Sequence, residues 1–169
     1  AAIKADGLIP AMLTGDAAGS ANTVAKTVGI AEANVHAQLL PEDKLNALKE
    51  IRKQSGAVMF VGDGINDAPV LAGADVGAAM GSGADAAIEA ADVVFMNSSV
   101  SAIPQAIKIA RATGSISMQN VIFALAVKLL VLVLGFVGFA NIWAAVFADT
   151  GVAMLCILNS MRILLKKFK

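Results

Sequence analysis

Hydrophobic and polar residues follow two different patterns along the chain, one before and one after about residue 120. In the first part, short apolar runs alternate with stretches whose apolar residues recur at helical spacing. The runs predict strands at 9–13, 34–40, 58–61, 76–80 and 92–96, and the stretches between them predict helices at 17–29, 41–55, 68–74 and 84–91. Repeated strand–helix–strand units predict an α/β fold with a doubly wound parallel sheet.

After residue 120 the chain is almost entirely apolar. Two runs, 121–139 and 142–165, are each long enough to cross a bilayer, and Ala140 and Asn141 predict a break between them. The stretch 104–120, which contains Lys108 and Arg111, predicts an amphipathic connector helix. We therefore expect a transmembrane helical hairpin, with a buried hairpin inside a large soluble protein as the alternative.

Composition supports this division. Apolar residues make up 57% of the chain and charged residues 15%, with a mean hydropathy of +0.74, whereas a soluble domain is about 45–50% apolar and about 25% charged. Residues 121–165 contain only three charges, on Lys128, Asp149 and Arg162. The net charge of zero gives no reason to expect a nucleic-acid partner.

The single cysteine and the first residues add two expectations. Cys156 alone excludes an internal disulfide and a cysteine-based structural zinc site. The sequence starts at Ala1, without an initiator methionine or a signal peptide, and it starts as if in mid-domain. We therefore expect it to be a piece of a longer protein.

The most informative motif follows the predicted strand at 58–61. Asp63 and Asp67 lie there in a turn with Gly62 and Gly64, at the carboxyl end of the strand. Open α/β sheets bind ligands at that edge, and glycines allow the backbone to approach a ligand closely. Two carboxylates are suitable ligands for a Mg²⁺ ion that is shared with a phosphate. The motif therefore predicts phosphate chemistry.

Two further polar positions are predicted at the same edge. Thr14, Gly15 and Asp16 follow the first predicted strand, and Lys44 lies in the first turn of the helix at 41–55. A hydroxyl and an ammonium group could hold phosphoryl oxygens while the carboxylates hold Mg²⁺, as phosphoryl transfer requires. Each of these residues alone is commonly a turn, cap or surface residue, so their combination carries the prediction.

Three segments together resemble the phosphorylation-domain motifs of P-type ATPases, which have a haloacid-dehalogenase-like fold. They are MLTGD at 12–16, LPEDK at 40–44 and GDGINDAP at 62–69, in the order of the family. The resemblance implies a partial phosphorylation domain at 1–103, the connector at 104–120 and two transmembrane helices with a basic tail at 121–169. It also implies an ATP-driven ion pump with Mg²⁺ as cofactor.

The resemblance also implies the roles of individual residues. Thr14, Gly15, Asp16 and Lys44 would serve the phosphoryl group, Asp63 and Asp67 would bind Mg²⁺, and Asn66 with Asp67 would organise the hydrolytic site. The nucleophilic aspartate of the family lies in a DKTGT segment, which does not occur in this sequence. We therefore expect the chain alone to be inactive, and the rest of the pump, with most of the ATP site, to lie upstream.

Lys128 and Asp149 lie inside the predicted spans, where a charge costs about 2.5–3.5 kcal/mol on insertion scales. At ~1.5 Å per residue they lie roughly 18 Å and 12 Å from the connecting loop. The offset is about one lysine side chain, so an ion pair between the two helices is feasible. A purely structural salt bridge is the alternative to a functional one.

This pair resembles a subgroup of the family, the zinc-, cadmium- and lead-exporting pumps, which have a lysine in the penultimate span and Asp-Thr-Gly in the last. The resemblance implies that Asp149 is a ligand of the transported metal and that Lys128 is its counter-ion. Copper(I) pumps have Asn-Tyr in the corresponding span, which is absent here. A copper(I) pump, a membrane-anchored phosphatase of the same fold and a non-catalytic subunit remain as alternatives.

The distribution of basic residues predicts the orientation. Lys108 and Arg111 precede the first span, and Arg162 with the lysines at 166, 167 and 169 closes the second. Cytoplasmic loops are enriched in Lys and Arg. We therefore expect an integral protein of the plasma (cytoplasmic) membrane, with the N-terminal domain and the C-terminal tail in the cytoplasm and lipid around the hairpin.

Overall fold

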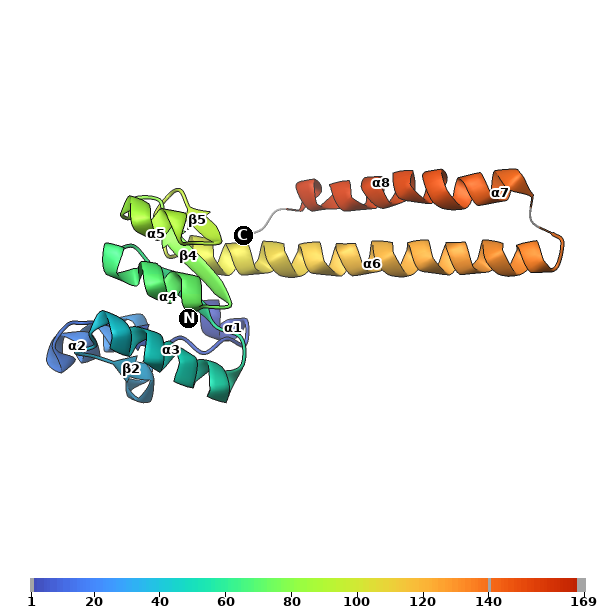
Figure 1. The fold of residues 1–169 in the computed structure, drawn as a ribbon. Coiled ribbons are helices and arrows are strands. Elements are labelled where there is room, and N and C mark those ends of the chain that lie inside the picture. Colours follow the sequence, from blue (N-terminus) through green and yellow to red (C-terminus); the bar gives the residue numbers. More distant parts are fainter. Residues whose placement is uncertain (1, 140, 167–169) are drawn as a thin grey trace. The chain divides into compact units, whose positions relative to one another are not determined.

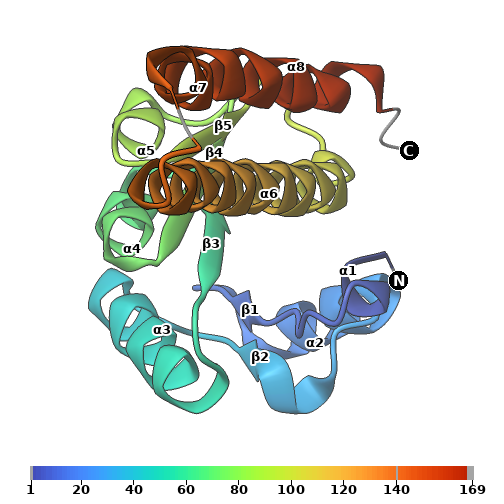
Figure 2. The ribbon, with the colours of Figure 1, turned by 90° about the vertical axis from the view of Figure 1, so that its right-hand side faces the viewer.

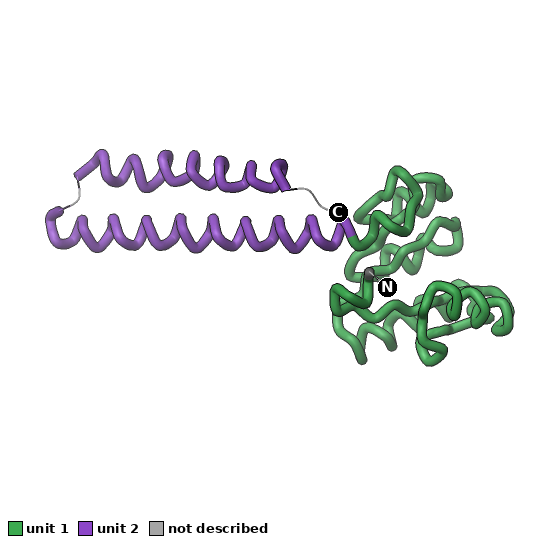
Figure 3. The backbone as a smooth tube through the Cα atoms, turned by 180° about the vertical axis from the view of Figure 1, so that it is seen from behind, with its two compact units in different colours: residues 1–104 green, residues 105–169 purple. Residues whose placement is uncertain are grey.

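The computed structural model describes residues 2–139 and 141–166. It divides into two compact units, residues 1–104 and residues 105–169, which are considered separately below (Figure 3). The expected division into a phosphorylation domain, a connector and a membrane part stays a prediction.

The first unit is an α/β domain (Figure 1). The strands and helices that sequence periodicity predicts are present, although most of the strands are shorter than predicted. The elements in chain order are α1 (Ala2–Ala5), β1 (Met12–Leu13), α2 (Ala18–Val28), a 3₁₀ turn (Glu32–Asn34), β2 (Val35–His36), α3 (Pro41–Ser55), β3 (Met59–Gly62), a second 3₁₀ turn (Ile65–Asp67), α4 (Ala68–Gly73), β4 (Val76–Met80), α5 (Asp85–Glu89) and β5 (Val93–Phe95).

The strands are parallel, but they form two sheets instead of the single sheet that was expected. β1 pairs with β2, and separately β3, β4 and β5 pair in that order (Figure 2). The expectation that β1 and β3 share one sheet edge is therefore not met. The backbone of β1 and of β3 is paired on one side only within the described residues.

Helix-end signals in the sequence correspond to the observed ends. Gly29 ends α2 in the left-handed conformation with φ 77°. At the start of α3, Pro41 occupies the first turn, and the Asp43 carboxylate accepts the backbone N–H of Leu40 at 3.2 Å. These contacts fix the first turn of α3, where Lys44 lies.

The core of this unit lies between the three-stranded sheet and its helices. Its buried side chains come from α3, β3, α4, β4 and α5, and they are Leu48, Phe60, Val70, Leu71, Ala79 and Ala87. The small alanines allow the helices to approach the sheet closely. Strand β3, which leads into the Gly62–Asp67 turn, is therefore packed into this core through Phe60.

The second unit is a helical hairpin. Its elements are α6 (Ala102–Phe136), α7 (Ile142–Val146), a π-helical turn (Phe147–Gly151) and α8 (Val152–Leu165). α6 is continuous, so the expected connector and the first span form one helix without a break near residue 120 (Figure 1). The expected break includes Ala140, which lies outside the described residues. The lysines at 167 and 169 of the expected basic tail lie outside them too.

Within the described residues, two helical stretches, Ala102–Phe136 and Ile142–Leu165, are long and apolar enough to cross a membrane. They run antiparallel, and the seam between them is made of mostly small or polar residues that are less exposed than their neighbours. The seam residues are Asn120, Ala124, Val127 and Val131 on α6, and Ala148, Val152, Cys156 and Asn159 on the second stretch. Small residues at such a seam are typical of helices that pack within lipid.

Candidate functional site

The turn after β3 folds the Asp67 side chain back toward the strand. Asp67 is 9% exposed, and its Oδ2 accepts the backbone N–H of Gly64 at 3.2 Å. A Cβ atom on Gly62 would lie 2.8 Å from the Cβ of Asp67, which is too close. Glycine at position 62 is therefore required for Asp67 to occupy this place.

Lys44 reaches the same carboxylate from α3. Its Nζ lies 2.8 Å from Asp67 Oδ1, and the two side chains are only 16% and 12% exposed. Partial burial limits screening by water, so this pair is stronger than a surface ion pair. The structure thus joins two predicted site residues that are far apart in the sequence.

Asp63 and Asn66 differ from Asp67 in being exposed. Within the described part of the chain, the Asp63 carboxylate has no hydrogen-bond or ion-pair partner, whereas its backbone oxygen accepts the N–H of Ala84 at 2.9 Å. A carboxylate that faces solvent at the end of a strand is available to an incoming cation.

Gly83, which no sequence pattern singled out, supports the turn that carries Asp63. A Cβ atom on Gly83 would lie 2.7 Å from the Asp63 backbone oxygen and 2.9 Å from that of Met80. The loop after β4 therefore packs against the backbone of the Asp63 turn only because residue 83 has no side chain. The available signal was a glycine-rich loop directly after the strand that pairs with β3.

Thr14 and Asp16 form a turn of their own at the carboxyl end of β1. The Thr14 hydroxyl donates to Asp16 Oδ2 at 2.9 Å, and the Asp16 backbone N–H donates to Thr14 Oγ1 at 3.2 Å. The Leu39 N–H donates to the Thr14 backbone oxygen at 3.0 Å, and a Cβ on Gly15 would lie 3.3 Å from the Leu39 oxygen. The turn is thus attached to the segment that leads directly into α3.

Within the described residues, no hydrogen bond or ion pair joins Thr14 or Asp16 to Lys44 or Asp67. Of the side chains predicted to converge, Lys44 and Asp67 are therefore in direct contact. The Thr14 turn is connected to them only through the start of α3. The catalytic and Mg²⁺-binding roles assigned to these residues stay predictions.

The donor set fits Mg²⁺. This ion usually takes one or two protein carboxylates and completes its shell with water and substrate phosphate oxygens. Asp63 offers a carboxylate that has no partner among the described residues, and Asp67 lies four residues further along the same turn with both oxygens already hydrogen-bonded. Asp63 is accordingly the better-placed ligand, with Asp67 and Lys44 as a charged pair beside it.

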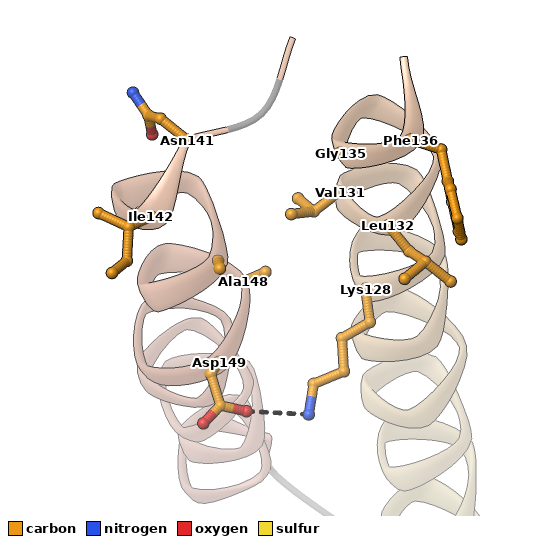
Figure 4. Close-up of a pocket in the computed structure, with 10 residues that line it drawn as sticks. Lys128, Val131, Leu132, Gly135, Phe136, Asn141, Ile142, Ala148 and Asp149 are labelled. Carbon is orange, nitrogen blue, oxygen red and sulfur yellow. Dashed lines mark ion pairs between the residues drawn. The ribbon is translucent and has the colours of Figure 1, made fainter. Parts of the chain in front are cut away.

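The hairpin carries the second candidate site. Lys128 on α6 and Asp149 in the π-helical turn point toward each other, and Lys128 Nζ lies 2.9 Å from Asp149 Oδ1 (Figure 4). The ion pair between Lys128 and Asp149, which the helix rise made feasible, is therefore formed. Its role in metal transport stays a prediction. An open groove of about 740 Å³ adjoins the pair, lined mainly by apolar residues such as Val131, Leu132 and Phe136.

The π-helical turn is centred on Asp149. Such widened turns are rare and occur frequently at functional sites. A Cβ on Gly151 would lie 2.6 Å from the Phe147 ring, so the absence of a side chain at Gly151 makes room for that ring one turn away.

Comparison with known proteins finds relatives for both units of the chain. A model of haloacid dehalogenase-like hydrolases matches residues 1–75. The chain is 49% identical over 163 residues to a cadmium, zinc and cobalt-transporting ATPase of Bacillus subtilis, which covers 94% of this chain and 23% of the relative. It is 52% identical over 155 residues to a zinc-transporting ATPase of Synechocystis, which covers 90% of this chain and 21% of the relative.

A solved structure matches almost the whole fold. The crystal structure of a zinc-transporting PIB-type ATPase in an E2.Pi state superposes with a TM-score of 0.90 and 40% identity over 96% of this chain and 26% of the other. The chain thus spans about a quarter or less of the length of these relatives. In sequence and in fold, the chain belongs to the P-type ATPase family, and its matches lie in the heavy-metal-transporting branch.

Proposed function

We propose that the chain forms part of an ATP-driven exporter of divalent heavy-metal ions, with Zn²⁺, Cd²⁺ and Pb²⁺ as the transported ions. The observation that carries this proposal is the Lys128–Asp149 ion pair at 2.9 Å between two mostly apolar helical stretches. Zn²⁺ accepts carboxylate oxygen as a ligand, whereas Cu(I) prefers sulfur. The names of the relatives, a cadmium, zinc and cobalt-transporting ATPase and a zinc-transporting ATPase, support the assignment for zinc and cadmium.

Asp149 is the proposed ligand of the metal, and Lys128 is its built-in counter-ion. While the metal is bound, the carboxylate is neutralised by the cation; when the metal leaves, the lysine takes its place. A pump with this arrangement needs no counter-transported ion to neutralise the carboxylate. The π-helical turn gives Asp149 a backbone environment that can adjust between these two partners.

The α/β unit is the proposed energy-converting part. Lys44 and Thr14 would contact the phosphoryl group, and Asp63 with Asp67 would hold Mg²⁺, which neutralises the charge of phosphate oxygens during transfer. Lys44 is held near this position by its 2.8 Å contact with Asp67. ATP would be bound mainly by a separate domain of the pump.

The nucleophile would come from another part of the same pump. Among the residues that the structure describes, β1 and β3 each have an unpaired side, which leaves room in the pairing pattern for a strand between the two sheets. A strand that carries the nucleophilic aspartate would join them into one parallel sheet and place the aspartate beside Thr14 and Asp63. The upstream domains and further membrane helices are the expected partners, and lipid of the plasma (cytoplasmic) membrane surrounds the hairpin.

The basic residues that flank the spans support an orientation with both ends of the hairpin in the cytoplasm. In that orientation the turn at 137–141 faces the outside. The open groove beside Lys128 and Asp149, which Asn141 and Ile142 also line, then lies between the ion pair and the outer side.

The deciding experiment is metal-stimulated ATP hydrolysis by the intact pump in lipid, with Zn²⁺, Cd²⁺, Pb²⁺, Co²⁺ and Cu(I), for the native protein and for Asp149→Ala. We expect stimulation by the first three ions and its loss in the variant. Thr150→Ala, which changes the neighbouring residue and keeps the carboxylate, serves as the matched control. Stimulation by Cu(I) alone, unaffected by Asp149→Ala, would overturn the assignment of the metal and of its ligand.

A further inference from the structure

A cluster of hydrogen-bonded polar side chains joins α6 to α8 at the end of the hairpin opposite the 137–141 turn. We call it the Asn120 cluster; its members are Asn120 on α6 and Cys156, Asn159 and Ser160 on α8. It adds to the two candidate sites described above, and none of its members belongs to either of them.

The side-chain amide of Asn120 uses both of its ends. Its Nδ2 donates to the Cys156 backbone oxygen at 3.1 Å and to Ser160 Oγ at 2.8 Å. Its Oδ1 accepts from Asn159 Nδ2 at 2.8 Å. Asn120 therefore makes three contacts with α8 through one side chain, which fixes its position both along and around that helix.

Two more contacts strengthen the cluster on the α8 side. The Cys156 thiol approaches the Asn120 backbone oxygen at 3.7 Å, and Asn159 Oδ1 accepts from the Arg162 guanidinium at 2.8 Å. An amide in a low-dielectric environment is costly unless it is hydrogen-bonded. Because every amide group here has a partner across or along the helices, separating α6 from α8 would leave several groups unsatisfied.

The cluster and the ion pair lie at matched distances along the two helices. Lys128 follows Asn120 by eight residues, or about 12 Å of helix, and Asp149 precedes Cys156 by seven residues, or about 10.5 Å. A shift of one helix past the other by a single turn, about 5.4 Å, would break the cluster and move the lysine away from the carboxylate. The two contacts therefore define the same register.

We propose that Asn120 is a positioning residue, which holds α6 and α8 in the register that places the Lys128 ammonium against Asp149. The ion pair has little other support, since its side chains are 56% and 76% exposed and most of their flanking residues are exposed too. The functional part of this inference rests on the function proposed above, because it assigns Asn120 an effect on metal handling through Lys128.

The test is a double-mutant cycle in the intact pump, with Asn120→Ala, Lys128→Ala and both together. We expect Asn120→Ala to slow turnover at saturating Zn²⁺ by about threefold to tenfold. This fold-change corresponds to the strength of hydrogen bonds between membrane helices. If Asn120 acts through Lys128, the double variant should resemble Lys128→Ala alone. The proposal would be overturned if the double variant were slowed by the product of the two single fold-changes. An unchanged turnover rate in Asn120→Ala would overturn it too.

Gln119→Ala is the matched control, because Gln119 is the exposed polar neighbour of Asn120 on α6. It should leave the rate unchanged. Should Asn120→Ala fail to accumulate in the membrane, Asn159→Ala removes one of the three contacts and goes through the same cycle, with the same criterion of non-additivity.

A second measurement does not depend on transport. Lys128→Cys and Asp149→Cys, in a Cys156→Ser background, are treated in membranes with a short thiol-to-thiol cross-linker, with and without Asn120→Ala. We expect the loss of the cluster to slow cross-linking severalfold. An unchanged cross-linking rate would show that Asn120 does not set the register. Slower cross-linking, together with a native pump that no metal stimulates, would support the register and refute the proposed function alone.

Discussion

The chain contains two lysine–aspartate pairs of nearly equal length in very different settings. Lys44 and Asp67 lie 2.8 Å apart with side chains only 16% and 12% exposed, while Lys128 and Asp149 lie 2.9 Å apart with side chains 56% and 76% exposed. The first pair is enclosed by its own domain. The second lies on a hairpin whose surroundings would be lipid and other helices.

The two ion pairs are held in place by different parts of the structure. Asp67 is held by Gly62, by the Gly64 N–H and by the first turn of α3, so local sequence determines its geometry. The pair in the hairpin has no such shell and depends on how two long helices are placed. A low dielectric around it would make the attraction stronger than exposure suggests, but would also make an unpaired charge costly. The first pair is thus a fixed part of a site, and the second is suited to exchange partners.

The largest effect is expected from breaking the enclosed pair. Lys44→Ala should lower ATP hydrolysis by the intact pump by about 10²–10³-fold, as for other groups that stabilise charge during the reaction. It also leaves the Asp67 carboxylate buried without its ammonium partner. Hydrolysis and phosphoenzyme formation from labelled ATP measure the loss.

Lys49→Ala is the control for this prediction, since Lys49 is an exposed lysine on the same helix. It should leave hydrolysis unchanged. A Lys44→Ala variant that hydrolyses ATP at the native rate would remove Lys44 from the phosphoryl site.

Breaking the hairpin pair should have a smaller and more selective effect. Lys128→Ala should slow turnover at saturating Zn²⁺ by about tenfold, equal to about 1.4 kcal/mol, because release of the metal leaves Asp149 without a counter-ion. Binding of Zn²⁺ should be weakened little or not at all. Titration of metal binding and steady-state hydrolysis separate the two quantities.

Lys128→Arg, which keeps the charge, should restore most of the rate. The outcome that contradicts the counter-ion role is a Lys128→Ala variant in which turnover and metal affinity both equal those of the native protein.

Much of the enclosed site could be predicted from the sequence, because it depends on local signals. Pro41 and Asp43 mark the start of α3, and Gly62 and Gly64 mark the turn after β3; all lie where expected. That Lys44 meets Asp67, rather than Thr14 or Asp16, was not predictable. It depends on the packing of α3 beside α4, which involves side chains from several elements.

In the hairpin, the sequence predicted the spans and the ion pair but not where the helices begin and end. Its apolar runs and its ion pair followed from hydropathy and helix rise. The continuity of α6 through residue 120 did not, because a change from amphipathic to apolar sequence alters the environment of a helix without ending it. The alternating pattern leaves strand pairing open, because pairing is a long-range property; the signal for a gap in the sheet was the absence of the DKTGT segment and of the strand that bears it.

A third prediction concerns the support of the enclosed site. Gly83→Ala should raise the Mg²⁺ concentration required for half-maximal hydrolysis severalfold, because the new Cβ, 2.7 Å from the Asp63 backbone oxygen, must displace that turn. Overpacking of this kind typically costs about 1–3 kcal/mol of stability as well. A Mg²⁺ titration of hydrolysis and a thermal melt measure the two effects.

Gly19→Ala serves as the comparison, because no atom lies within 4 Å of a Cβ at that position of α2. It should be neutral or slightly stabilising, by up to about 1 kcal/mol. If Gly83→Ala and the native pump require the same Mg²⁺ concentration, the loop after β4 does not support the Asp63 site.

The smallest effect is expected at an ion pair that faces water. Arg52 on α3 contacts Asp75, with side chains 54% and 23% exposed, and the Asp75 carboxylate also accepts the Val58 backbone N–H at 2.9 Å. Arg52→Ala should cost less than about 1 kcal/mol of the free energy of unfolding, since solvent screens an exposed pair. Asp75→Ala should cost more, because the Val58 N–H beside β3 loses its acceptor. Chemical unfolding of the two variants tests the order; a larger loss for Arg52→Ala would mean that the charge, not the backbone hydrogen bond, holds this strand end in place.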